Sequence, residues 1–151
     1  MTVTNTSEDG GHCGIRMRNA NVELLDVAFK GCDDHGLLVP NPTSKTTVVA
    51  TRCEFANSMY GALVSGSLTS ATFNKCVFND NKYEGIYVSN KATTHLHGEA
   101  TAIHSNGQHG IYARDSSKVI IHLPSHHNTS YNNGGQDRWT STGGTITNVE
   151  D

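Results

Sequence analysis

Residues 76–88 read Cys-Val-Phe-Asn-Asp-Asn-Lys-Tyr-Glu-Gly-Ile-Tyr-Val, and the rest of the chain repeats this unit with variation. Apolar side chains alternate at Cys76 and Phe78, a polar corner follows, and Gly85 opens a second alternation at Ile86 and Val88. Alternation with a period of two directs one face of a strand inward and the other outward. The unit therefore predicts a strand, a turn and a second strand.

A glycine followed by apolar residues at its first and third positions recurs along the chain. These glycines stand 22 to 25 residues apart, at Gly14, Gly36, Gly61, Gly85 and Gly110. A fixed interval of this length is the signature of a repeat architecture in which each repeat stacks on the previous one.

Two further apolar series keep the same interval. One series comprises Val27/Phe29, Cys53/Phe55, Cys76/Phe78 and Thr101/Ile103. The other precedes it in each repeat and comprises Val22/Leu24, Val48/Ala50, Ala71/Phe73, Leu96/Gly98 and Val119/Ile121. Consecutive pairs such as Leu24 and Val27 lie an odd number of residues apart, so the chain must bend between them to keep its apolar face inward. Each repeat therefore holds three short strands.

Composition supports β-structure in a single domain. Of the 151 residues only 35% are hydrophobic and 17% charged, and the chain is rich in Gly, Asn, Ser and Thr. Turn-rich β-structure suits this composition, whereas a helix bundle needs Leu, Ala, Glu and Lys at helical spacing. The four cysteines are too far apart for a metal finger, and we expect no disulfide framework.

Charge and hydropathy exclude two classes of partner. The net charge is −3 and no cluster of Lys or Arg is present, so we expect no nucleic-acid partner, because duplex binding requires a basic face. No apolar run is long enough to cross a bilayer, and the polar start of the chain lacks the apolar region of a signal peptide. We therefore expect a soluble chain without membrane insertion or an export signal; its compartment stays open.

The best physical solution is a solenoid in which each coil buries its inner face against its neighbours and pairs its backbone with the coils above and below. The predicted inner columns are Ile15/Leu37/Ala62/Ile86/Ile111, Met17/Val39/Val64/Val88/Ala113 and Phe29/Phe55/Phe78/Ile103. Asparagines in the polar corners are expected to form a ladder from coil to coil. We expect one domain over residues 1–151, with a polar N-terminal tail (1–11), coils (12–133) and a C-terminal cap or tail (134–151). Exposed coil ends suggest self-association.

The pattern Cys-x-Phe-x-x-Asn followed by Gly-Ile-x-Val resembles the repeat of the right-handed, pectate-lyase-like parallel β-helix superfamily. The resemblance covers roughly Cys13 to Asn133. It implies an all-β fold, a single right-handed parallel β-helix of about five coils with three short strands in each. Similar proteins include polysaccharide lyases, polygalacturonases, epimerases, phage tailspikes and non-catalytic adaptors, so the resemblance specifies an architecture and leaves the activity open.

One outward column is a candidate binding face. The residue between the two inward positions that follow each repeat glycine is Arg16, Leu38, Leu63, Tyr87 or Tyr112. An exposed stripe of Leu and Tyr is unusual and is typical of a surface that binds sugar rings or a protein. The alternative is that this stripe packs under a loop or in an oligomer contact.

Metal and catalytic sites are less strongly indicated. The chain has nine histidines, and His97, Glu99 and His122 form a candidate transition-metal or proton-shuttle site, although solvated outward histidines explain them more simply. A loop containing His122, His126 and His127 is a weaker zinc candidate. We expect no cofactor.

No pair of carboxylates suited to catalysis emerges. The strand-borne acids Asp26, Glu54 and Glu99 fall in different columns, and the adjacent Asp33 and Asp34 are typical turn formers. Cys53 and Cys76 share one inward column. Cysteines in such a buried position usually act as small hydrophobic residues and not as catalytic thiols.

We therefore expect a non-catalytic structural or binding module associated with carbohydrate or a surface. A polysaccharide lyase, hydrolase or epimerase and a protein-interaction adaptor are the alternatives.

Overall fold

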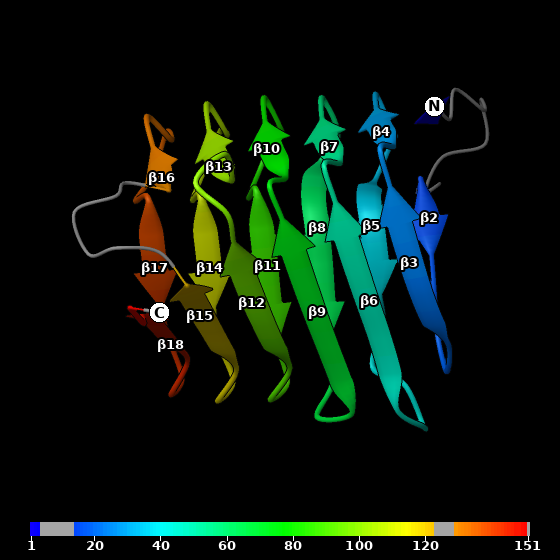
Figure 1. Cartoon of the computed structure of the whole chain (residues 1–151). Helices are drawn as coiled ribbons and strands as arrows, with labels where there is room; N and C mark the ends of the chain where they lie inside the picture. Colours follow the sequence, from blue (N-terminus) through cyan, green and yellow to red (C-terminus); the bar gives the residue numbers. More distant parts are fainter. Residues whose placement is uncertain (4–13, 123–128, 151) are drawn as a thin grey trace.

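The computed structural model describes residues 1–3, 14–122 and 129–150, and within them every regular element is a β-strand. The strands form three parallel six-stranded sheets, A, B and C, which the chain visits in turn (Figure 1). The fold is therefore the predicted all-β, right-handed parallel β-helix.

The strands of each sheet come from successive coils. Sheet A contains β1 (Thr2–Val3), β4 (Ala28–Lys30), β7 (Glu54–Ala56), β10 (Val77–Asn79), β13 (Ala102–His104) and β16 (Ser130–Tyr131). Sheet B contains β2 (Ile15–Arg16), β5 (His35–Val39), β8 (Tyr60–Ser65), β11 (Ile86–Ser89), β14 (Ile111–Ala113) and β17 (Arg138–Thr140). Sheet C contains β3 (Asn21–Leu25), β6 (Thr46–Thr51), β9 (Thr69–Asn74), β12 (Thr93–His97), β15 (Lys118–His122) and β18 (Thr145–Asn148).

The predicted inner columns are confirmed by the strand register. Leu37 pairs with Ala62, Ala62 with Ile86 and Ile86 with Ile111. In sheet A the Phe55 ring stacks on those of Phe29 and Phe78, with centroids 5.3 and 4.8 Å away. These columns fill the interior of the coil, so the hydrophobic core is one continuous strip along the solenoid axis.

The inward column of sheet C differs from the prediction in the fourth coil. The inward pair is Thr94 and Leu96, which pair with Val119 and Ile121, and not Leu96 and Gly98. Thr94 is completely buried and takes the place that an apolar residue takes in the other coils. An alignment of the coils based only on apolar residues is therefore wrong by two positions along β12. The same error shifts the predicted positions of the outward residues on this strand by two.

The repeat glycines allow adjacent coils to approach closely. A Cβ atom on Gly36 would lie 2.6 Å from the carbonyl oxygen of Gly61, and one on Gly85 would lie 2.8 Å from that of Gly110. Contacts this short are sterically forbidden, so the glycine recurs because the backbone of the next coil occupies the space that a side chain would need.

The bend from sheet C to sheet A is made by a single residue in the left-handed conformation. Asp26, Arg52 and Lys75 have φ angles of 53°, 51° and 52°, and Gly98 has 87°. This bend provides the odd step that the apolar pattern predicts. Two of these corner residues also pair across coils, because Arg52 donates from Nε to Asp26 Oδ1 at 2.7 Å.

The predicted asparagine ladder is present at the corner between sheets A and B. Asn81, Asn106 and Asn133 stack in successive coils, and the Nδ2 group of each of the first two donates to the Oδ1 atom of the next at 2.9 Å. Asn106 Oδ1 also accepts from the backbone N–H of Asn81, and Asn106 Nδ2 donates to the Phe78 carbonyl. The ladder thus satisfies backbone groups that leave the sheets at a buried corner.

The strands extend beyond the coil boundaries expected from sequence. Thr2 and Val3, in the expected tail, form β1 and pair with Ala28 and Phe29. Beyond residue 133, β17 and β18 continue sheets B and C in register with β14 and β15. The described part of the chain contains no helix with the length and apolar character needed to cross a membrane.

Replacing Asn106 by Ala is expected to lower the free energy of unfolding by about 2–4 kcal/mol, because the backbone N–H of Asn81 and the carbonyl of Phe78, both at one buried corner, lose a partner. Urea denaturation measures this change. Asn79→Ala is the matched control, since Asn79 ends β10 in the preceding repeat and its side chain donates to its neighbour Asp80; it should cost less than about 0.5 kcal/mol. Equal losses in the two variants would show that the ladder adds no stability of its own.

Candidate functional site

The outer face of sheet B carries the predicted column. Arg16, Leu38, Leu63, Tyr87 and Tyr112 are paired partners on successive strands. The four residues after Arg16 are half-buried, so their side chains lie against the sheet with one side open to solvent. The column is therefore a continuous apolar and aromatic strip along the solenoid axis.

The structure adds Trp139 to this column. It pairs with Tyr112 on the adjacent strand and is 38% exposed. Sequence reasoning missed this residue because the expected coils ended at residue 133. The sequence does hold a signal for this residue, because Trp139 follows Tyr112 along the chain by roughly one repeat length.

A second set of aromatic residues runs beside the column. The Tyr60 ring lies against the rings of His35, Tyr83 and Tyr87, with centroids 5.0, 5.3 and 6.2 Å away. The His109 ring stacks on Trp139 at 5.5 Å. We call Leu38, Leu63, Tyr87, Tyr112, Trp139, Tyr60, Tyr83 and His109 together the aromatic face. His35, Tyr60 and His109 each directly precede a repeat glycine, which is the sequence signal for this second set.

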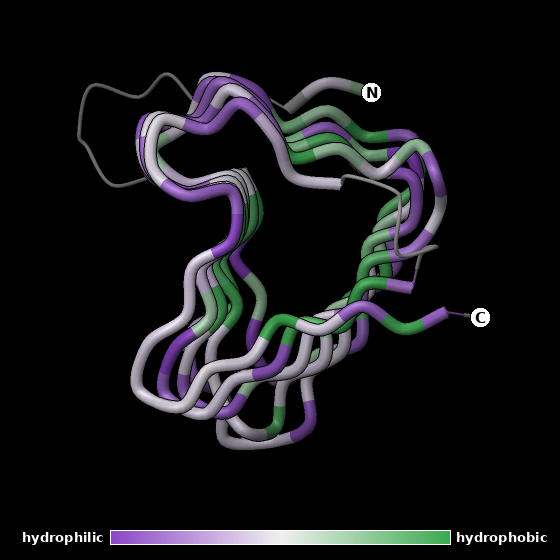
Figure 2. Tube along the Cα trace, turned by 90° about the vertical axis from the view of Figure 1, so that its left-hand side faces the viewer, coloured by the Kyte–Doolittle hydropathy of each residue, from purple (hydrophilic) through white to green (hydrophobic). Residues whose placement is uncertain are grey.

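The shape of the coil sets the aromatic face back from its surroundings. Seen along the solenoid axis, the chain trace bends inward at sheet B, on the left of Figure 2, and projects outward at the corners before and after it. A shallow polar hollow follows the corners after sheet B and is lined by Asn41, Ser67, Asn90, Lys91, Asp115 and Ser116. Polar groups therefore border the aromatic face on this side.

Hydrogen bonds fix two of the half-buried tyrosines. The Tyr112 hydroxyl lies 2.9 Å from Ser141 Oγ, and Arg114 donates to the Tyr87 hydroxyl at 3.4 Å. Arg114 also forms an ion pair with Asp115 at 2.9 Å. The ring positions are thus set before any ligand arrives, which lowers the entropic cost of binding.

Glu84 is a buried acid at the margin of the aromatic face. Only 5% of it is exposed, and it is the one buried carboxyl group among the described residues. Burial raises the pKa of Glu84 above its usual value, and the nearby His109 offsets part of this shift. Burial and the charge of Glu84 in turn raise the pKa of the Tyr60 hydroxyl. Sequence reasoning treated Glu84 only as part of a corner.

The other acids considered from sequence do not join Glu84. Glu54 lies on sheet A and pairs with Lys30 at 2.7 Å, while Asp26 pairs with Arg52. Asp34 contacts His35 Nδ1 at 3.0 Å; burial lowers the pKa of His35 and the Asp34 charge partly opposes this. These carboxylates are therefore engaged in separate local pairs.

Cys53 and Cys76 occupy the shared inward column expected for them. Both are free thiols buried in the core, and their Sγ atoms donate to backbone carbonyls. Burial raises the pKa of Cys76 to about 12. A thiol that does not ionise near neutral pH is a poor nucleophile, so the structure favours the packing interpretation.

The metal candidates from sequence come together differently from the prediction. His97 pairs directly with His122 on the outer face of sheet C, and the third residue near them is His95. Glu99 is exposed and follows the end of β12. The difference arises because the predicted alignment was wrong by two positions along β12. That alignment placed Glu99 opposite His122, where the structure places His97. His126 and His127 lie outside the described residues.

The three histidine side chains form a compact cluster, which we call the sheet C histidines. His95 Nδ1 is 2.9 Å from His122 Nε2, and the rings of His97 and His122 stack with centroids 4.0 Å apart. All three are half-buried. Burial, together with the charge of His122, lowers the pKa of His95.

Comparison with known proteins identifies the fold. A family profile described as "Right handed beta helix region" matches residues 5–150, nearly the whole chain. No curated protein and no solved structure matches the chain. The ligand and any activity depend on the side chains that the fold presents, since one fold serves many functions.

Glu84→Gln is expected to change how stability depends on pH. A raised pKa means that the folded state keeps its proton over a window that begins near pH 4.5, the ordinary value for glutamate, and ends at the raised pKa. Through this window the stability of the wild type should fall with rising pH relative to the variant. Urea denaturation of both proteins across the window measures the difference. A constant difference would contradict a raised pKa at Glu84.

Native protein treated with iodoacetamide at pH 8 should leave Cys76 unmodified, because alkylation requires an accessible thiolate. Peptide mapping by mass spectrometry reads this site separately from the other cysteines. The same treatment in urea should label it fully, which controls for detection. Rapid labelling of Cys76 in the folded protein would contradict the buried, un-ionised thiol.

Proposed function

Because the chain belongs to the right handed beta helix family and its coils align outward side chains in columns along each sheet, we propose that it is a binding module for a neutral polysaccharide. The binding surface is the aromatic face of sheet B. The single observation that carries the proposal is the register-aligned column from Leu38 through Leu63, Tyr87 and Tyr112 to Trp139.

The direction of the column favours an extended ligand. Successive strands of a sheet lie about 4.8 Å apart, so the column offers one apolar or aromatic side chain at each such step along the axis. A linear polymer of rings lying parallel to the axis meets the same chemistry repeatedly. Contacts from several coils then add up, although each contact alone is weak.

The chemistry of the aromatic face suits sugars. A sugar ring has an apolar face of C–H groups and a rim of hydroxyls, and tyrosine and tryptophan provide flat apolar area with a polar handle. The polar hollow lined by Asn90, Asp115 and Ser116 adds hydrogen-bonding groups along the same edge. This combination favours a carbohydrate over a purely apolar partner surface.

The charges near the face support a neutral ligand. Arg114 pairs with Asp115, and Glu84 is buried beside the face. An array of free basic groups, which uronate chains would require, is not evident around the described part of the face, and the whole chain has a net charge of −3. A single buried acid also supports binding without cleavage, because glycosidases ordinarily use two carboxyl groups.

The test begins with an array of neutral glucans, galactans, xylans and arabinans, and uronate polymers are included for comparison. Trp139 is the only tryptophan in the chain, so its fluorescence reports contact at the aromatic face directly. We expect a neutral glycan to bind and to shift the Trp139 emission. Product analysis by reducing-end and unsaturated-sugar assays should find the glycan intact.

Tyr112→Ala is expected to weaken binding of that glycan about tenfold, the loss that corresponds to one aromatic contact of about 1.4 kcal/mol. The matched control is Tyr131→Ala, because Tyr131 is a half-buried tyrosine that stacks on His104 but lies on sheet A. Fluorescence titration of both variants gives the two affinities.

Three results would refute the proposal: no neutral glycan binds, binding leaves Trp139 emission unchanged, or only uronates bind. Equal weakening in the two variants would likewise place the ligand away from the aromatic face. Cleaved glycan would favour the hydrolase or lyase alternative.

A further inference from the structure

We propose that His95, His97 and His122 form a binding site for a divalent transition metal ion of the zinc class on the outer face of sheet C. The site is separate from the aromatic face, because it lies on a different sheet of the solenoid. The proposal rests on the positions of the three ring nitrogens and on the donor chemistry of imidazole.

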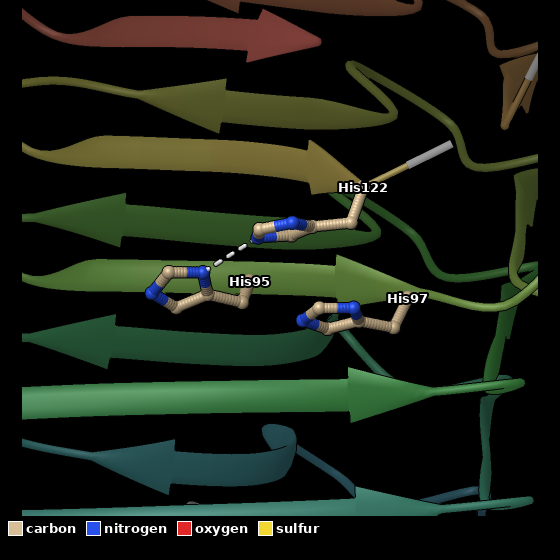
Figure 3. Close-up of side chains that lie close together, drawn as sticks. All are labelled: His95, His97 and His122. Atoms are coloured by element: carbon tan, nitrogen blue, oxygen red, sulfur yellow. Dashed lines mark hydrogen bonds between the residues drawn. The ribbon is translucent and has the colours of Figure 1, made fainter. Parts of the chain in front are cut away.

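The strand register brings the three side chains together. Histidines two residues apart on β12 point to the same face of the sheet, as period two requires. His122 on β15 lies directly opposite His97, so it is the diagonal neighbour of His95. All three project outward from two adjacent, paired strands, and Figure 3 shows their rings gathered over this part of the sheet.

The distances fit shared coordination. His95 Nδ1 and His122 Nε2 are 2.9 Å apart, and each of the three residues has one ring nitrogen that lies within 4.8 Å of a nitrogen of the other two. Zinc binds imidazole nitrogen at about 2.0–2.1 Å, which places two nitrogens of a tetrahedral site about 3.3 Å apart. Small rotations of the half-buried side chains therefore bring three nitrogens to one ion.

The donor set selects the class of metal. Imidazole nitrogen suits Zn²⁺, Cu²⁺ and Ni²⁺, whereas Ca²⁺ and Mg²⁺ prefer oxygen ligands. Without metal, His95 and His122 share one proton across a nitrogen–nitrogen contact. A metal ion takes the place of that proton and accepts a lone pair from each ring.

The site leaves a coordination position open. Three protein ligands with a fourth position for water is the arrangement of reactive zinc centres, whereas purely structural sites use four protein ligands. The side chains are half-buried, so solvent reaches the cluster from outside the sheet. The strands beneath hold the ligands on a rigid frame, since β12 is paired on both sides, with β9 and with β15.

The test is a titration of the full chain with Zn²⁺ by isothermal calorimetry. We expect one zinc ion per chain and a rise in the melting temperature, because a ligand that binds only the folded state stabilises it. His95→Ala and His122→Ala should each weaken zinc binding by more than tenfold, since even residues outside the first coordination shell contribute 10- to 100-fold. Circular dichroism without zinc checks that each variant keeps its fold.

Two controls locate the site. His104→Ala removes a half-buried histidine on sheet A that stacks on Tyr131, and it should leave the zinc affinity unchanged. The double variant His126→Gln/His127→Gln should also bind zinc normally. The absence of stoichiometric binding would overturn the proposal. Full affinity in His95→Ala, or loss of binding in the double variant, would do the same.

Discussion

Close contact between the backbones of successive coils is the constraint on which the rest of this structure depends. Parallel strands pair at a fixed spacing, and the repeat glycines remove the side chains that would hold the coils apart at the start of sheet B. Once the coils meet at this distance, each inward residue must lie on its counterpart in the next coil. The flat stacking of Phe29, Phe55 and Phe78 is a consequence of this geometry.

The same constraint organises the outer surface. A side chain that points away from the core also has a counterpart in each neighbouring coil, so residues far apart in sequence become neighbours in rows. Sheet B uses this to build a row of apolar and aromatic rings, while sheet C places histidines from two coils side by side. Two faces with different chemistry thus share one scaffold.

Sequence predicted the architecture and the columns because the repeat spacing and the period of two are both visible in the residues. The column of Leu38, Leu63, Tyr87 and Tyr112 was predicted by counting from each glycine. The role of His95 was not predictable in this way, because Thr94 is buried where the pattern calls for an apolar residue. An alignment that counts apolar residues then places Glu99 opposite His122. The backbone pairing of β12 with β15 shows that His97 lies there instead. The raised pKa of Glu84 depends on how deeply its corner packs, which spacing alone does not reveal.

The corners between sheets differ in how much length they accept. The turn from sheet C to sheet A is short in the early coils, where it holds a single left-handed residue at Asp26, Arg52 or Lys75, and it lengthens to residues 98–101 in the next coil. The connection from sheet B to sheet C is variable: it spans residues 40–45 in one coil and only 66–68 in the next, yet the strands on either side keep their register. Insertions can therefore accumulate at the latter corner without shearing the stack. Evolution, or a designer grafting a recognition loop, has an open position there, beside the edge of the aromatic face.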